Sequence, residues 1–168
     1  MAALDFNPRA PRGARRGGLT LNDTRQAKAY LWRVRDAERE LKRLEEEYEQ
    51  AKSDILHLKA MEYDADKVTG GKIGDLSDAI AAIEGYMERL GKQWDKLIAL
   101  REDAKARIEQ IEDGRYRDVL VRRYLQGDSW EWIALGMGYD LRWVFRLHGK
   151  ALRDILKMTI ERHIRPVI

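Results

Sequence analysis

Small and apolar residues recur at alternating steps of three and four along two long stretches of this chain, residues 27–58 and 76–111. Arg and Glu fill most of the positions between them. This is the heptad spacing of helices that pair along one apolar seam. A turn-rich interruption near 66–74 separates the stretches. Because a long helix with one apolar stripe needs a partner along its length, the pattern predicts a long antiparallel helical hairpin, or coiled coil, over 23–112.

A parallel coiled coil between two chains fits the same heptads, so that alternative stays open. The two helices are expected to start at Asp23, which forms a capping-box pattern with Gln26, and at Asp75. Arg101 interrupts the second apolar stripe, where it would set the register or pair with an acid on the facing helix. Other apolar residues lie off the main seams and indicate a second surface, for self-association. They are Leu31, Leu56, Tyr86, Ile98 and Leu100.

Residues 113–158 predict a separate bundle of three shorter helices with a helix-turn-helix arrangement. The first helix covers 115–126 and would lie behind the other two. The helix-turn-helix itself spans 129–152. Ser129 and Asp140 stand where each of its helices would begin, and both side chains can accept a hydrogen bond from an unpaired backbone N–H.

Four residues occupy the positions on which such a turn depends. Ala134 is small where the two helices would touch, and Gly138 permits the backbone of a tight turn. Val144 and Leu147 are spaced to face back toward the bundle. These positions predict how the module packs.

The segments that flank the helices are polar. Residues 1–22, rich in Arg, Gly and Pro, predict a disordered basic tail, either a phosphate-contacting arm or a solvated leader. Residues 159–168 predict a C-terminal tail, with Pro166 barring a longer helix.

The composition supports an all-α protein, because 44% of the 168 residues are hydrophobic, 36% are charged and only three are Pro. The chain has no Cys, and its three His are scattered, so we expect no disulfide, metal or cofactor. No nucleophile, base and orienting group stand together, and an enzyme is not expected. No apolar run is long enough for a membrane span or a signal peptide. These features favour the cytoplasm.

The charge is unevenly distributed although the formal net charge is only +3. The first 26 residues hold five Arg and two Asp, and residues 113–168 hold 11 basic and seven acidic residues. Residues 27–112 instead hold 16 basic and 20 acidic residues. Two basic ends around an acidic middle favour nucleic-acid contact at the ends.

The last predicted helix carries a basic stripe opposite its apolar one. Arg142 and Arg146, near its start, are the candidates for DNA base contacts, because an Arg fork matches guanine O6 and N7. The candidates for DNA backbone contacts are Arg122, Arg123, Ser129, Lys150 and Arg153.

Aromatic residues of this region are expected to pack rather than to bind DNA. Trp143 and Phe145 flank the basic stripe, where a thymine methyl is the alternative partner. Trp130 and Trp132 bracket the first helix of the pair and should face the core. His148 lies near the inward side and is expected to be a packing residue.

The run from Tyr116 to Ile155 resembles region 4 of bacterial sigma factors. The similarity rests on Val119-Leu120, Arg123-Tyr124, Ile133-Ala134, Gly138-Tyr139-Asp140, Val144, Leu147 and Lys150-Ala151-Leu152. A long hairpin followed by this module also resembles a family of small phage and prophage transcriptional regulators, relatives of phage late-gene activators. Upstream there is only coiled coil, without the promoter-melting region 2 of a sigma factor, so the resemblance implies a regulator rather than a sigma factor. It does not imply promoter specificity, because Leu141, Trp143 and Phe145 stand where sigma factors often carry polar or basic residues.

The expected function is therefore that of a sequence-specific DNA-binding transcriptional regulator of phage or prophage origin. Its partners would be double-stranded DNA and, through the hairpin, either a second copy of the chain in a dimer or host RNA polymerase. Two alternatives stay open. One is a DNA-recognition protein for genome packaging, similar to a small terminase subunit, and the other is a coiled-coil structural adaptor that does not bind DNA.

Overall fold

The computed structural model describes residues 21–65 and 73–164, and every secondary-structure element within them is helical. This confirms the all-α class. In chain order the elements are α1 (Leu21–Ala65), α2 (Ile73–Glu109), α3 (Gly114–Leu120), the π-helical segment η1 (Val121–Gln126), α4 (Trp130–Met137) and α5 (Leu141–Ile164). The predicted tails and turn fall largely on residues 1–20, 66–72 and 165–168, which lie outside the described residues.

Several helix ends differ from the sequence-based expectation, and α2 ends at Glu109 rather than at residue 112. α1 starts at Leu21 and α2 at Ile73, each two residues early, so the proposed caps Asp23 and Asp75 lie inside helices. α5 runs to Ile164 rather than ending at Met158. None of these extensions contains a Pro, the residue that would block them.

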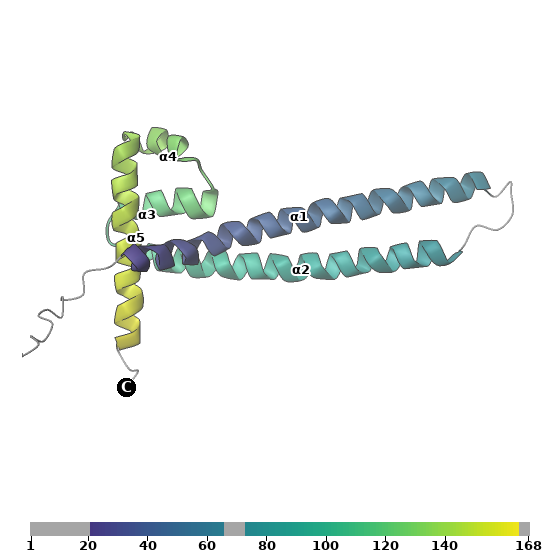
Figure 1. Ribbon diagram of the computed structural model, residues 1–168, viewed down its shortest axis with the longest axis horizontal. Coiled ribbons are helices and arrows are strands. Elements are labelled where there is room, and N and C mark those ends of the chain that lie inside the picture. The colour runs from purple at the N-terminus through teal and green to yellow at the C-terminus, as the bar shows by residue number, and fades with distance from the viewer. Residues whose placement is uncertain (1–20, 66–72, 165–168) are drawn as a thin grey trace, which may run out of the picture.

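α1 and α2 lie side by side and run in opposite directions (Figure 1). Two contacts between residues far apart in the sequence fix this pairing. The Tyr30 hydroxyl donates to Asp103, and the Gln93 side chain donates to the Ala37 carbonyl at 3.0 Å. An intramolecular antiparallel hairpin is therefore the observed arrangement of these helices.

The α2 seam is narrower than the heptad pattern predicted. Ile80, Met87 and Trp94 are 44%, 57% and 48% exposed, whereas Leu97 and Ala104 are buried. The heptad positions of α2 form two parallel columns of apolar residues, and a single partner helix covers only part of their combined width. On a straight helix a strict heptad stripe also rotates by about 20° per heptad, away from the partner. One column of α2 therefore faces outward.

Arg101 pairs with an acid on the facing helix, as the sequence predicted. One of its terminal nitrogens, Nη1, lies 2.7 Å from Glu38 Oε1, and the other, Nη2, donates to the Leu125 carbonyl at 2.9 Å. The second bond satisfies a carbonyl near the end of η1, where Gly127 adopts φ 82. A Cβ on Gly127 would also meet the Arg35 guanidinium at 2.4 Å. The hairpin and the bundle therefore fit closely here.

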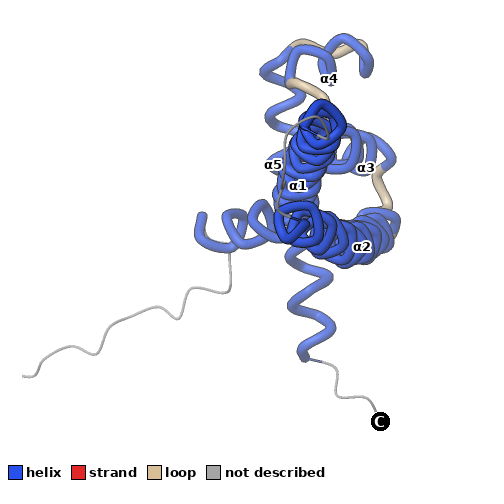
Figure 2. The backbone as a smooth tube through the Cα atoms, turned by 90° about the vertical axis from the view of Figure 1, so that its right-hand side faces the viewer, coloured by secondary structure: helices blue, strands red, loops and turns tan. Residues whose placement is uncertain are grey.

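α5 stands across the base of the hairpin, with α3 and α4 beside its N-terminal half (Figure 1). Seen along the hairpin, α5 extends above and below α1 and α2 (Figure 2). Most of the buried residues form one cluster that includes both parts. Its fully buried members are Leu31, Ile108, Val119, Leu120, Tyr124, Ile133, Val144 and Ala151. Leu31, expected on a second surface, lies in this core, while Leu56 and Ile98 are exposed.

The single helix expected over 115–126 changes its hydrogen-bonding pattern along its length. Its first half is the α-helix α3, and its second half is the π-helical segment η1. η1 contacts α1 and α2 as well as α4. Within η1 the adjacent residues Tyr124 and Leu125 are both buried, at 0% and 8% exposure.

Candidate nucleic-acid interface

The turn between α4 and α5 is built by three local side-chain or backbone features that the sequence predicted. The Ser129 hydroxyl accepts a hydrogen bond from the Trp132 N–H at 3.3 Å and caps α4. Gly138 ends α4 in the left-handed conformation, with φ 69. Asp140 then caps α5, because its Oδ1 accepts from the Trp143 N–H at 2.8 Å. The start and direction of α5 are thereby fixed.

The four positions expected to pack the module hold the expected kinds of contact. Ala134 is 8% exposed, Val144 is fully buried and Leu147 is 2% exposed. Gly138 has no neighbouring atom within 4 Å of an added Cβ, so its backbone angle and not crowding requires glycine. One face of α5 is therefore held against the bundle, and the opposite face is left for solvent.

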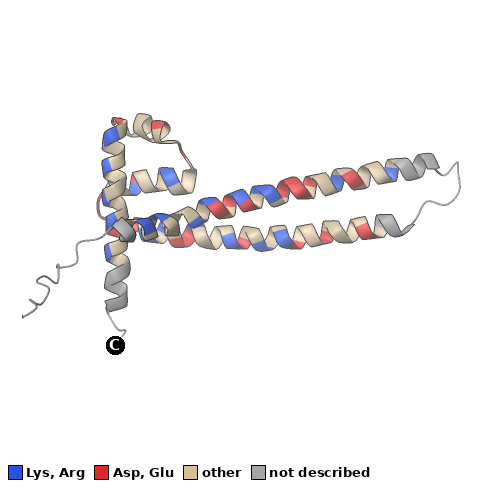
Figure 3. Ribbon diagram, in the orientation of Figure 1, with Lys and Arg blue, Asp and Glu red and all other residues tan. Residues whose placement is uncertain are grey.

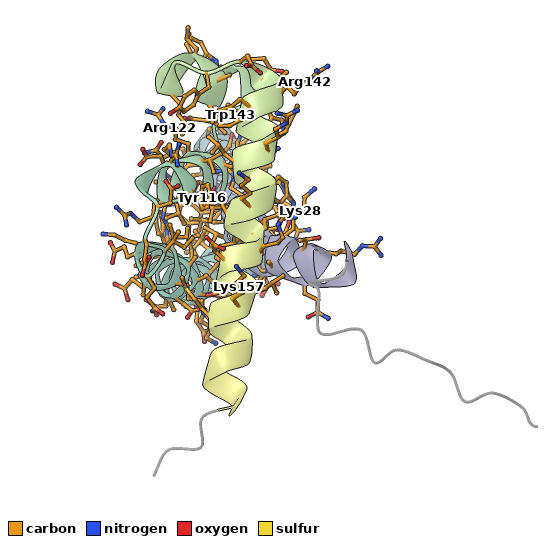
Figure 4. All side chains as sticks on the ribbon, turned by 90° about the vertical axis from the view of Figure 1, so that its left-hand side faces the viewer. Lys28, Tyr116, Arg122, Arg142, Trp143 and Lys157 are labelled. Atoms are coloured by element: carbon orange, nitrogen blue, oxygen red, sulfur yellow. The ribbon has the colours of Figure 1, made fainter. Side chains whose placement is uncertain are left out.

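The solvent face of α5 carries four cations. Arg142, Arg146, Lys150 and Arg153 are exposed, and none has an ion-pair or hydrogen-bond partner within the described part of the chain. Figure 3 shows Lys and Arg recurring along α5, and in Figure 4 Arg142 projects away from the bundle. At 1.5 Å per residue the row is about 16 Å long. Gly149 leaves open space within it.

Arg122, a candidate for a DNA backbone contact, is partly exposed and lies beside the loop that precedes α4. Its Nη1 lies 3.6 Å from Asp128 Oδ2, and a Cβ on Gly136 of α4 would come within 2.7 Å of the same nitrogen. The guanidinium therefore supports the loop that leads to Ser129.

Arg123 is also held by intramolecular partners. Its guanidinium lies over the Trp130 ring at 4.5 Å and the Trp32 ring at 5.3 Å, and Nη1 donates to the Asp128 carbonyl at 2.9 Å. Cation–π contacts of this kind are favourable by about 0.5–2 kcal/mol each. Arg123 is thus a fixed charge beside α1 rather than a mobile surface group.

The tryptophans of α4 differ in environment. The Trp130 ring packs edge-on against Phe145 at 5.0 Å, as expected for a packing residue. Trp132 was expected to face the core but is 66% exposed, because it lies on the outer face of α4 together with Leu135, which is 72% exposed. Leu141 at the start of α5 is 38% exposed.

His148 packs in the bundle, as expected. Its Nε2 lies 2.9 Å from the Tyr124 hydroxyl, and its ring lies 4.9 Å from that of Trp130. Burial, together with the positive charges of Lys28 and Arg123, lowers the pKa of His148 to about 4. Burial likewise raises the pKa of the Tyr124 hydroxyl well above its usual range. The pair is neutral at pH 7.

This pKa predicts an acid-sensitive fold. Below pH 6.5 the unfolded chain protonates His148 while the folded chain does not, so stability falls as the pH drops from 6.5 toward about 4. At pH 5 the loss should be about 2 kcal/mol. Urea unfolding at pH 7 and pH 5 should show that His148→Gln, which keeps a hydrogen-bonding side chain, loses about 2 kcal/mol less than the wild type over this interval. Equal losses in both proteins would contradict the assignment.

A cavity of about 460 Å³, which was not predicted from the sequence, adjoins this module. Its lining residues come from the start of α1, from η1 and from the start of α4: Arg25, Lys28, Ala29, Trp32, Arg123 and Trp130. The signal available in the sequence was the spacing of Arg25, Lys28 and Trp32, which places them on one face of a helix.

Neither a protein-family model, nor a curated protein, nor a solved structure matches the chain. Within the described ranges no group of three or more His, Asp or Glu side chains is arranged to hold a metal ion. None of the helices in those ranges has an apolar stretch able to cross a bilayer.

Proposed function

We propose that this protein is a sequence-specific transcriptional regulator of the phage or prophage type that binds double-stranded DNA through α5. The observation that carries the proposal is the exposed row of cations on α5 without intramolecular partners. A row of unpaired positive charges on a helix that a tight turn presents to solvent suits the DNA major groove, which is about 12 Å wide.

The roles of the residues follow from their position along α5. Arg142 and Arg146 lie in its first two turns, where the recognition helix of a helix-turn-helix contacts base edges. Their guanidinium forks suit guanine O6 and N7. Lys150 and Arg153 lie farther along and neutralise phosphates, and the exposed Ser129 hydroxyl can donate to another phosphate.

The test is selection of bound duplexes from a random pool, followed by sequencing. Enrichment of one motif by the wild-type protein would support the proposal. Uniform recovery of all duplexes would show that α5 binds DNA only by non-specific electrostatic attraction, and it would contradict the proposal of sequence-specific binding.

A structural adaptor is the second candidate, favoured by one observation. Trp132 and Leu135 on the outer face of α4 are 66% and 72% exposed, and large exposed apolar residues grouped in this way mark protein contacts. An adaptor that docks through this patch would recover no duplex in the same selection. We favour the regulator because this apolar patch does not account for the cation row on α5.

The hairpin is assigned to self-association. On the outward column of α2, Ile80, Met87 and Trp94 follow one another at seven-residue spacing, and Ile98 extends the same exposed surface. A second copy that brings the same column forms a self-complementary apolar seam. A dimer also suits a helix-turn-helix protein that reads two half-sites.

The double substitution Met87→Glu/Trp94→Glu is expected to break this dimer. The substitutions place charges in the apolar seam, so dimer affinity should fall at least tenfold, as measured by light scattering at micromolar concentration. Ala82→Glu/Ala99→Glu, which adds the same charge at other exposed α2 positions, is the control and should stay dimeric. A monomeric wild type would contradict self-association and leave RNA polymerase as the partner to test for this surface.

A further inference from the structure

The cavity beside the helix-turn-helix is lined by three cations and two indole rings. Arg25 and Lys28 project from the first turns of α1, and Arg123 faces them from η1. Among the described residues that line the cavity there is no Asp or Glu. Three positive charges around one space repel one another, so the cavity is suited to an anion.

The cations differ in mobility in a way that suits ligand binding. Arg123 is fixed between Trp32 and Trp130, and only part of its donor capacity is used by the Asp128 carbonyl. Arg25 and Lys28 are exposed and have no ion-pair partner within the described residues. The cavity thus combines one rigid donor with two long side chains that can close on an anion.

The positive charges of this region affect the neighbouring side chain of His148. Lys28 and Arg123 both act, after burial, to lower the pKa of His148. His148 also contacts Trp130, which forms a wall of the cavity. A bound anion would offset this potential, which no acidic side chain among the described lining residues does.

The cavity adjoins the cation row of α5. Trp130 packs against Phe145, which is 46% exposed and stands on α5 directly before Arg146. Figure 4 shows Lys28 and Arg142 projecting on the same side of α5. A helix in the major groove has a sugar–phosphate backbone on each side, and the cavity lies beside α5 where one of them would pass.

We propose that this cavity binds a backbone phosphate of the duplex that α5 reads, so that the start of the hairpin completes the DNA interface. The inference rests on the proposed function. The indole rings would border the deoxyribose, and the three cations would contact the phosphate oxygens. An acidic protein segment would neutralise the cations of the cavity but leave the cation row of α5 without a partner. A single DNA duplex would neutralise both groups of cations.

The experiment measures the affinity of the full chain for its selected duplex between 50 and 200 mM salt. Each phosphate contact contributes about 0.9 to the slope of log affinity against log salt. Arg25→Ala/Lys28→Ala should lower that slope by about 0.9, so its affinity falls about 3.5-fold less than that of the wild type over this range. Its preference for the selected sequence should be unchanged, because the cavity contacts no base.

Arg89→Ala/Lys92→Ala is the matched control, since it removes an exposed Arg and Lys three residues apart on α2. It should keep the wild-type slope. Arg25→Lys/Lys28→Arg keeps both charges and should also keep the slope, which separates a charge effect from a folding defect.

Other outcomes distinguish the two proposals. A wild-type slope in Arg25→Ala/Lys28→Ala, with DNA bound normally, would overturn the phosphate site and leave the role of α5 intact. Loss of binding to a Glu-rich peptide in this variant, with an unchanged DNA slope, would assign the cavity to a protein partner. A wild-type protein that binds no duplex would overturn the proposed function as well.

Discussion

Alanine at both Arg142 and Arg146 is expected to abolish the preference for the selected DNA site while the protein stays folded. Each bidentate contact between Arg and guanine discriminates by about 1–3 kcal/mol, so two should give about 2–6 kcal/mol, or roughly 30-fold to 10⁴-fold in specific affinity. Both side chains are exposed and lack intramolecular partners in the described chain, so stability should change by less than about 0.5 kcal/mol. Fluorescence anisotropy at fixed salt, with the selected and a scrambled duplex, measures the ratio.

The matched control for this variant is Arg39→Ala/Arg43→Ala. It removes two exposed Arg residues at the same four-residue spacing from α1, and it should leave the ratio of specific to non-specific affinity unchanged. Lys150→Ala/Arg153→Ala should instead weaken binding to both duplexes alike, because phosphate contacts carry no sequence information. If Arg142→Ala/Arg146→Ala lost equal affinity for both duplexes, the two side chains would be assigned to phosphate contacts. The basis for base recognition by α5 would then be removed.

The features of the helix-turn-helix that the sequence predicted correctly are local ones. Ser129 and Asp140 cap helices through backbone N–H groups three residues ahead, and Gly138 makes a turn through its own φ angle. Such interactions need no knowledge of distant residues. The exposure of Arg142 and Arg146 also follows from helical periodicity once the buried face is known.

The features that the sequence did not predict concern residues whose surroundings come from elsewhere in the chain. Arg123 is a candidate for a DNA backbone contact in the sequence, but its stacking against Trp32 of α1 depends on a residue far away in the chain. Trp132 reads as a core residue, yet α4 has only one covered face and this residue lies on the other. Arg25 and Lys28 share a helix face in the sequence, but nothing in their spacing shows that the face borders η1 and α4.

The hairpin shows the same division. Heptad spacing predicted two paired helices, but it could not decide which of two apolar columns on α2 faces α1. The outward column, with Met87 and Trp94 about half exposed, follows from the presence of a single partner helix. Leu31 lies off the heptad seam and is nevertheless fully buried, because α1 also packs against α5 and η1.

Leu31→Ala is expected to destabilise the hairpin and the bundle together. Leu31 is fully buried in the cluster that both parts share, so its truncation leaves a cavity and should cost about 2–5 kcal/mol. Because the core is continuous from α1 into α5, unfolding in urea should remain a single transition. Circular dichroism, which reports mainly the long helices, and the fluorescence of Trp130 and Trp143 in a variant lacking the other three Trp, should give coincident midpoints.

Leu56→Ala makes the same chemical change at a position that is 65% exposed on the same helix. It should cost less than about 0.5 kcal/mol, because a truncation at the surface leaves no cavity. A Leu31→Ala protein whose circular dichroism and fluorescence transitions separate would show that the hairpin folds independently of the bundle. That result would also weaken the phosphate-site proposal, since the position of Arg25 and Lys28 beside α4 depends on the junction that Leu31 fills.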